Sequence, residues 1–154
     1  MKNFFTLFSL PIKFSINLDD LEKKYFFFQR QFHPDAAGVA EIENSMDVNE
    51  GYEILRNPLR RAAHILQLNN IDVEKDGGAI KPDMATLSEV LEIQESIFDL
   101  DIQGIVDLKK YLNNKINSSL EDIAAKLDNK EFMAAAQLLI KAKYFDKILR
   151  DLRK

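Results

Sequence analysis

Apolar residues recur at the spacing of an α-helix along nearly the whole chain, and this limits the fold more than any other feature. The clearest stretch has four residues at positions i, i+4, i+7 and i+11, on one helix face: Leu21, Tyr25, Phe28 and Phe32. Asn17 precedes the stretch and is a suitable N-cap, because its side-chain oxygen can accept a backbone N–H of the first turn. No alternation of apolar and polar residues typical of a strand persists anywhere. The sequence therefore predicts an all-α protein.

A second helical pattern follows, and its predicted apolar stripe consists of Ile42, Met46, Asn49, Tyr52 and Leu55. Asn49 is the polar member of the stripe, and if buried it needs a partner, most simply a backbone group. Asn57-Pro58 then reads as the N-cap and first residue of a short helix that runs through Leu66. His64 within this helix is expected to be structural or exposed.

The first ten residues contain an apolar run from Phe4 to Leu10 that could be mistaken for a signal peptide. Pro11 follows the run at once, and no small-residue cleavage pattern appears. A short structural helix is the preferred interpretation.

Residues 69–82 interrupt the helical periodicity and are the best candidate for a domain boundary, since they contain Asp76-Gly77-Gly78 and Lys81-Pro82. Pro82 is predicted to open a helix, and longer patterns follow over 102–127 and from about 130 to 152. Three helices joined by short turns favour an antiparallel bundle. The predicted divisions are an N-terminal helical domain over 1–72, a linker over 73–81, and a C-terminal three-helix bundle over 82–154.

Composition removes several classes of function. The chain of 154 residues has no cysteine, which excludes disulfides, thiolate catalysis and cysteine-ligated metals, and two histidines make a metal site improbable. The net charge of −4 argues against nucleic-acid binding, and no apolar stretch is long enough to span a membrane. Neither a phosphate-binding loop nor a nucleophile–base pair is present, so we expect no cofactor, no metal and no enzyme activity.

The tripeptide His33-Pro34-Asp35 stands at the end of the first helical pattern and before the breaker-like Ala36-Ala37-Gly38. Proline ends a helix because it lacks a backbone donor and clashes with the preceding turn. The histidine and aspartate could form an acid–base pair, they could serve recognition on an exposed loop, or the tripeptide could be only a helix stop.

With its flanking helices the tripeptide resembles the docking loop of a J-domain, and several further segments resemble the HscB family of J-domain co-chaperones. In the first domain these are FTLF (5–8), FFQRQFHPD (27–35) and NEGYEILRNPL (49–59). In the second they are LSEVLEIQESI (87–97), FMAAA (132–136) and KAKYFDKI (141–148). The resemblance covers essentially the whole chain and implies an N-terminal J-domain, a helical hairpin with short flanking helices, joined to a C-terminal three-helix bundle.

The resemblance implies a co-chaperone that binds the iron–sulfur scaffold protein IscU, delivers it to the DnaK-like chaperone HscA and stimulates the ATPase activity of that chaperone. Such a protein assists cluster maturation and transfer without holding a cluster itself. The missing cysteine-bearing N-terminal extension of eukaryotic relatives favours a cytoplasmic protein of bacterial type. A runner-up keeps the J-domain but gives the bundle another client or a dimerisation role, and a more distant alternative is a purely structural interaction protein.

Two sets of site residues follow from the resemblance. The chaperone-binding set is His33, Pro34, Asp35, Lys23, Lys24 and Arg30. The scaffold-binding set is Leu87, Ser88, Leu91, Glu92, Glu95 and Tyr144. Leu87, Leu91 and Glu95 are spaced four apart and share a helix face, which supports an exposed patch. The competing interpretation is that Leu87, Leu91 and Tyr144 are ordinary bundle core. Because Val90, Ile93 and Ile97 also compete for the interior, however, both faces of the helix cannot be buried equally.

Overall fold

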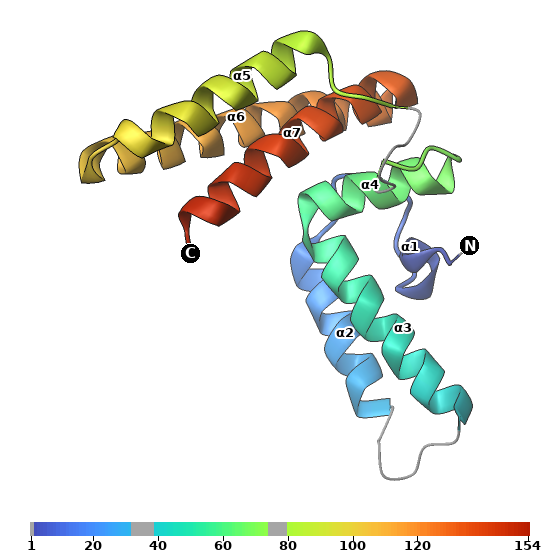
Figure 1. The fold of residues 1–154 in the computed structure, drawn as a ribbon. Helices are drawn as coiled ribbons and strands as arrows, with labels where there is room; N and C mark the ends of the chain where they lie inside the picture. Colours follow the sequence, from blue (N-terminus) through green and yellow to red (C-terminus); the bar gives the residue numbers. More distant parts are fainter. Residues whose placement is uncertain (1, 32–38, 74–79) are drawn as a thin grey trace. The chain divides into compact units, whose positions relative to one another are not determined.

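The computed structural model describes residues 2–31, 39–73 and 80–154, and it confirms the prediction of an all-α protein. The chain forms two compact units, Met1–Asn69 (unit 1) and Asn70–Lys154 (unit 2). Unit 1 contains α1 (Phe4–Leu7), α2 (Leu18–Gln31), α3 (Val39–Arg56) and α4 (Pro58–Leu68), and unit 2 contains α5 (Met84–Ser96), the 3₁₀ helix η2 (Ile97–Asp99), α6 (Ile102–Asp128) and α7 (Phe132–Leu152) (Figure 1).

Both helix starts predicted from asparagine are confirmed in unit 1. The side-chain oxygen of Asn17 accepts the backbone N–H of Asp20 at 3.0 Å, at the start of α2. Asn57 accepts the backbone N–H groups of Leu59 and Arg60 at 3.0 and 3.2 Å, with Pro58 as the first residue of α4. These bonds satisfy donors that the first turn of a helix otherwise leaves without a partner.

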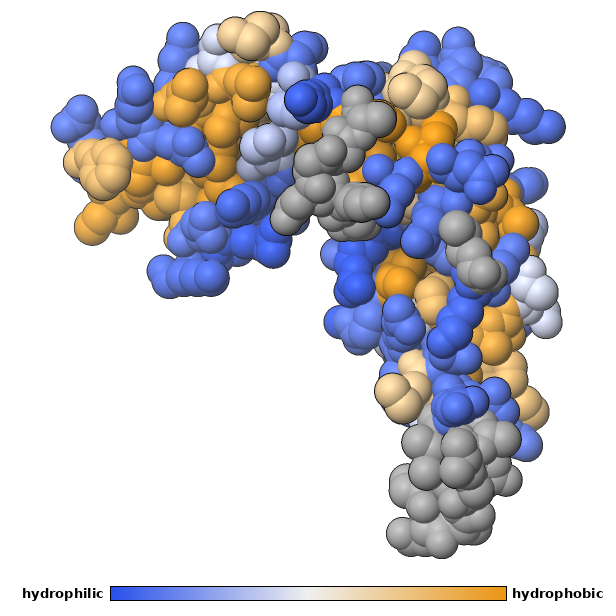
Figure 2. Space-filling model, turned by 45° about the vertical axis from the view of Figure 1, so that its right-hand side comes forward, coloured by the Kyte–Doolittle hydropathy of each residue, from blue (hydrophilic) through white to orange (hydrophobic). Residues whose placement is uncertain are grey.

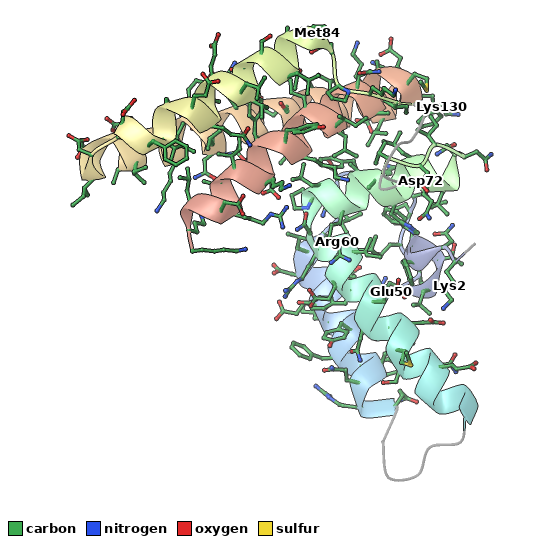
Figure 3. The ribbon with its side chains drawn as sticks, viewed as in Figure 1. Lys2, Glu50, Arg60, Asp72, Met84 and Lys130 are labelled. Carbon is green, nitrogen blue, oxygen red and sulfur yellow. The ribbon has the colours of Figure 1, made fainter. Side chains whose placement is uncertain are left out.

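The predicted N-terminal structural helix is confirmed as α1, and its aromatic side chains build much of the core of unit 1. Phe4, Phe5 and Phe8 are buried, and α1 packs against α3. The backbone N–H of Phe4 donates to Nε2 of the buried His64 at 3.1 Å, so His64 is structural. Lys2 Nζ also donates to Asp47 of α3 at 2.6 Å (Figure 3). A four-residue helix is thereby held by burial and by two polar contacts.

The apolar stripe predicted for α3 is confirmed at Leu55 but wrong at Met46 and Asn49. Met46 is 64% exposed and Asn49 is exposed, whereas Val48, Gly51 and Leu55 are buried. Both α1 and α2 pack against α3, and the rings of α1 reach the backbone of α3 at the glycine. The buried line therefore runs through the residue with no side chain, which a search for apolar spacing passes over.

Unit 2 is a helical bundle in which α7 packs against both α5 and α6 (Figure 1). Its first helix begins at Met84 and not at Pro82, because the carboxylate of Asp83 caps it by accepting the Thr86 N–H at 2.7 Å. The core cluster consists of Val90, Leu112, Ile116, Phe145, Ile148 and Leu149.

The turn between α6 and α7 depends on one left-handed residue, Lys130, which has φ of 59° (Figure 3). Beyond it the Glu131 N–H returns to the Lys126 carbonyl at 2.8 Å, which is the closing bond of a Schellman motif. This bond satisfies a carbonyl at the end of α6 and lets α7 reverse direction within a few residues. Most of the predicted linker, 73–81, lies outside the described residues.

Candidate docking surfaces

The basic face predicted for α2 lies away from the core of unit 1. Leu21 is fully buried, whereas Lys23 and Arg30 are exposed. Lys24 differs from them, because its Nζ lies 3.2 Å from an Asp20 carboxylate oxygen and 3.3 Å from the Ser9 carbonyl oxygen. Among the residues that the structure describes, neither Lys23 nor Arg30 has an ion-pair partner. These two cations are therefore the ones available for an external acidic group.

The predicted docking tripeptide, His33-Pro34-Asp35, lies outside the described residues. In the sequence it falls between Gln31, where α2 ends, and Val39, where α3 begins. Its role remains a prediction.

A polar and aromatic cluster that the sequence did not predict joins α2 to α3. The rings of Tyr25 and Tyr52 stack with centroids 3.9 Å apart and an interplanar angle of 4°. The Tyr25 hydroxyl donates to Asn49 Oδ1 at 2.9 Å and accepts from Gln29 Nε2 at 2.7 Å. The expectation that Asn49 is a buried amide bonded to backbone is thus wrong. Instead, the cluster holds the two helices in one register, in the hairpin that carries the predicted docking loop.

The second predicted surface lies on α5. Its inner side is formed by the buried Thr86 and Val90, with Ile93 and Ile97 packed against the core cluster. Of the predicted scaffold-binding residues, Leu91 is 57% exposed, and Ser88, Glu92 and Glu95 are exposed as well. Leu87 is half-buried, and so is Tyr144 of α7, which packs against the core cluster. The helix therefore presents leucine between carboxylates, while Tyr144 belongs partly to the core.

A contact between α5 and α6 engages one carboxylate of this region. The Tyr111 hydroxyl donates to Glu89 Oε1 at 2.6 Å. This hydrogen bond, with burial and the negative charge of Glu89, raises the pKa of Tyr111 to about 12. Glu89 is thereby occupied, whereas no hydrogen bond or ion pair engages Glu92 or Glu95 within the described residues. The outer face of α5 is thus apolar and acidic, and it suits a partner with apolar and basic groups.

Apolar side chains are also exposed where α5 gives way to α6, and the sequence did not single out this end as a surface. Phe98 is 90% exposed, Ile102 87% and Val106 51%. Figure 2 shows hydrophobic residues gathered at this end of the bundle, at the left of the view. Single exposed apolar residues are ordinary on protein surfaces, but adjacent ones indicate an interaction surface.

Other kinds of site find no support in the part of the chain that the structure describes. No group of histidine and acidic side chains there could hold a metal ion. No helix there is long and apolar enough to cross a membrane.

The architecture of both units matches known co-chaperone structures over the whole chain. The human co-chaperone protein HscB has a TM-score of 0.89 at 22% identity, with 99% of this chain and 81% of that chain covered. Chaperone HscB from Vibrio cholerae has a TM-score of 0.85 at 26% identity and coverages of 99% and 96%. The Jac1 co-chaperone from Saccharomyces cerevisiae has a TM-score of 0.87 at 27% identity and coverages of 99% and 93%. The fold is thus the one that these HscB and Jac1 co-chaperone structures share.

The comparison of the sequence with known protein families concerns the second unit. Residues 82–153 match the family model described as the HSCB C-terminal oligomerisation domain. The second unit is therefore similar in sequence to the C-terminal domain of HscB co-chaperones. The structures that match along the whole chain are described as a chaperone and as co-chaperones.

Proposed function

We propose that the protein is an adaptor that binds the iron–sulfur scaffold IscU through unit 2, delivers it to the DnaK-like chaperone HscA and stimulates the ATPase activity of HscA through unit 1. The J-domain would span 1–72, and the scaffold-binding bundle 82–154. The observation that carries the proposal is the likeness to HscB and Jac1 co-chaperones along the whole chain. Each unit also has one exposed face of the expected character, basic on α2 and apolar with carboxylates on α5.

The proposed chaperone contact combines the tripeptide His33-Pro34-Asp35 with Lys23, Lys24 and Arg30. Exposed charges act mainly by steering and orienting the encounter, so this part of the contact weakens as salt is added. Lys24 is expected to contribute less than Lys23, because Asp20 and the Ser9 carbonyl already hold its ammonium group.

Steady-state ATP hydrolysis by HscA, with and without the chain, tests this contact. We expect the wild type to raise the rate and His33→Gln to abolish the increase while leaving the thermal unfolding curve unchanged. His64→Gln is a matched control for histidine, since it is expected to lower stability through the lost contact with Phe4 and to keep stimulation at temperatures where the chain is folded. A wild type that leaves the chaperone rate unchanged rules out the proposed function.

The proposed scaffold contact uses Leu87, Ser88, Leu91, Glu92, Glu95 and Tyr144. Burial of the exposed part of Leu91 would supply the apolar part of the binding energy, on the order of 1 kcal/mol. Exposed carboxylates at Glu92 and Glu95 would orient a basic region of the scaffold.

Binding of the full chain to IscU, measured by calorimetry, tests the scaffold contact. Leu91→Ala is expected to weaken binding on the order of tenfold without unfolding the bundle. Val90→Ala is the matched control, because Val90 is 5% exposed and its truncation should lower stability instead of affinity. Ser88→Met adds apolar surface at an exposed position and should tighten binding. Unchanged affinity in both Leu91→Ala and Ser88→Met would show that this face does not bind the scaffold.

A dimerisation role for the bundle is the second candidate, and one combination of observations favours it. The family model that matches residues 82–153 is described as an oligomerisation domain, and Phe98, Ile102 and Val106 form an exposed apolar end within those residues. Sedimentation of the full chain over a range of concentrations tests it. Dimers that Phe98→Asp dissociates would support this role, and a monomer at every concentration would exclude it.

A further inference from the structure

Two phenylalanines lie on the outer face of α2 beside the available cations. Phe26 is 45% exposed and Phe27 is 56% exposed. Phe26 stands three residues after Lys23 and four before Arg30, and Phe27 stands four after Lys23 and three before Arg30. Because side chains three and four apart are neighbours on a helix surface, these four residues form one patch. We call them the aromatic–cationic patch.

Neighbouring aromatic rings support both exposed rings. The Phe27 ring meets Phe28 edge-on, with centroids 5.9 Å apart, and Phe28 meets the buried Phe8 in the same way at 5.8 Å. The Phe26 ring lies 5.7 Å from Tyr25, which stacks on α3 through Tyr52. A surface supported in this way loses little side-chain entropy when a partner covers it, so more of the burial energy is retained as affinity.

We propose that the aromatic–cationic patch is the α2 part of the chaperone-docking surface, and that it fits an acidic protein surface containing an apolar recess. This inference rests on the proposed function and adds Phe26 and Phe27 to the contact. The ammonium of Lys23 and the guanidinium of Arg30 would face carboxylates at the rim, while the two rings would enter the recess. Aromatic side chains flanked by cations are a frequent composition for the centre of a protein interface.

An anionic lipid surface is the other partner that could attract aromatic and basic groups, and the charges of α2 disfavour it. The helix carries three acidic residues, Asp19, Asp20 and Glu22, and three basic ones, Lys23, Lys24 and Arg30, so its formal charge is zero. The whole chain has a net charge of −4. Interfacial helices that bind anionic lipid carry an excess of lysine and arginine on the polar face.

The two halves of the patch should respond differently to salt. Interactions between exposed charges are largely screened beyond about 8 Å at physiological ionic strength, whereas burial of a ring is not weakened by added salt. Substitution of the cations should therefore matter most at low salt. Substitution of the rings should matter at every salt concentration.

The test measures how much protein is needed for half-maximal stimulation of the chaperone ATPase, at low and at high salt. We expect the double variant Phe26→Ala, Phe27→Ala to need on the order of tenfold more protein at both salt concentrations. Lys23→Ala with Arg30→Ala should show a loss at low salt that shrinks at high salt. Met133→Ala is the control, because it removes from unit 2 an apolar side chain that is 56% exposed, as Phe27 is, and it should leave stimulation unchanged.

Each further outcome has a distinct meaning. A wild type that stimulates, together with a phenylalanine double variant that is folded and equally active, overturns this inference and leaves the proposed function intact. A wild type that fails to stimulate overturns both. If the double variant unfolds, Phe26→Gln and Phe27→Gln are measured singly, and unchanged stimulation in both also overturns the inference. Binding to phosphatidylcholine vesicles containing phosphatidylserine that is lost in the double variant would assign the patch to lipid instead.

Discussion

Gly51 is the position where the smallest substitution tests the packing of unit 1 most directly. It lies inside α3, where replacement of glycine by alanine ordinarily favours the helix by about 1 kcal/mol. An added Cβ, however, would lie 2.7 Å from Cδ1 of Phe4 and 3.1 Å from Cε2 of Phe8. Carbon atoms in contact are normally about 3.5–4.0 Å apart, so a ring or a helix must move by nearly an ångström.

The rings of α1 have little room for such a movement. Phe4 is 5% exposed and its backbone N–H is bonded to His64, and Phe8 is 1% exposed. Overpacking in a well-packed core costs about 1–3 kcal/mol, and the upper part of that range applies where the neighbours are fixed. After the helix-propensity gain is subtracted, we expect Gly51→Ala to lower the free energy of unfolding of unit 1 by about 1–2 kcal/mol. The corresponding decrease in Tm is roughly 5–10 °C.

Hydrogen exchange measured by mass spectrometry provides the assay, since it reads each unit separately. Peptides from α1 and α3 should exchange faster in Gly51→Ala, while peptides from α6 and α7 act as an internal reference. Gly104→Ala is the control in α6, where the nearest atoms belong to the Leu100 and Asp101 side chains, and we expect a change within about 0.5 kcal/mol. Adding Phe4→Leu to Gly51→Ala should recover part of the loss. Slower exchange in Gly51→Ala would refute the close packing of α1 on α3.

Three further predictions concern single groups. Burial lowers the pKa of His64, whose Nε2 must stay unprotonated to accept the Phe4 N–H, so the unfolded chain binds the proton more readily than the folded chain. The contribution of His64 to the stability of unit 1 is therefore complete above the unfolded pKa of about 6.5. Below that pH the free energy of unfolding should fall by up to about 1.4 kcal/mol per pH unit, which urea unfolding at several pH values measures. The difference in the free energy of unfolding between wild type and His64→Gln should accordingly be smaller at pH 5 than at pH 7, and an equal difference at the two pH values would contradict this. Lys130→Gly should raise the Tm, because glycine adopts the left-handed conformation without the roughly 1 kcal/mol cost of a side chain, and an unchanged or lower Tm would argue against the Schellman turn. Ultraviolet titration should show one tyrosine ionising near pH 12, and Tyr111→Phe should remove that step; if the step persists, the bond to Glu89 is not its cause.

The elements of the fold could be predicted from the sequence wherever a local rule decides them. Asn17 and Asn57 cap helices because the bond runs from a side chain to a backbone group two or three residues away. The bundle helices follow from apolar spacing that extends over many turns. In the same way the exposed character of Lys23, Arg30 and Leu91 follows from helix geometry once the buried side is known.

Prediction was weaker where several elements compete for one residue. The stripe expected on α3 included Met46 and Asn49 besides Leu55, but α1 and α2 both pack on this helix, and its buried line runs through Val48 and Gly51 to Leu55. The start of α5 also shifted, since Asp83 takes the cap position after Pro82. Such outcomes depend on contacts between residues far apart in the chain, which the local pattern does not contain.

By itself, then, the sequence determined the helical class of this protein and, through its motifs, the resemblance to HscB co-chaperones. Helix periodicity and capping act over one or two turns, so they can be read from neighbouring residues. Only the tertiary structure decided which side of each helix is available to a partner. It buried His64 against α1, left Phe26 and Phe27 beside two cations, and turned Val90 inward so that Leu91 stayed exposed. Burial is a property of the packed unit, because the surface that covers a residue comes from another part of the chain.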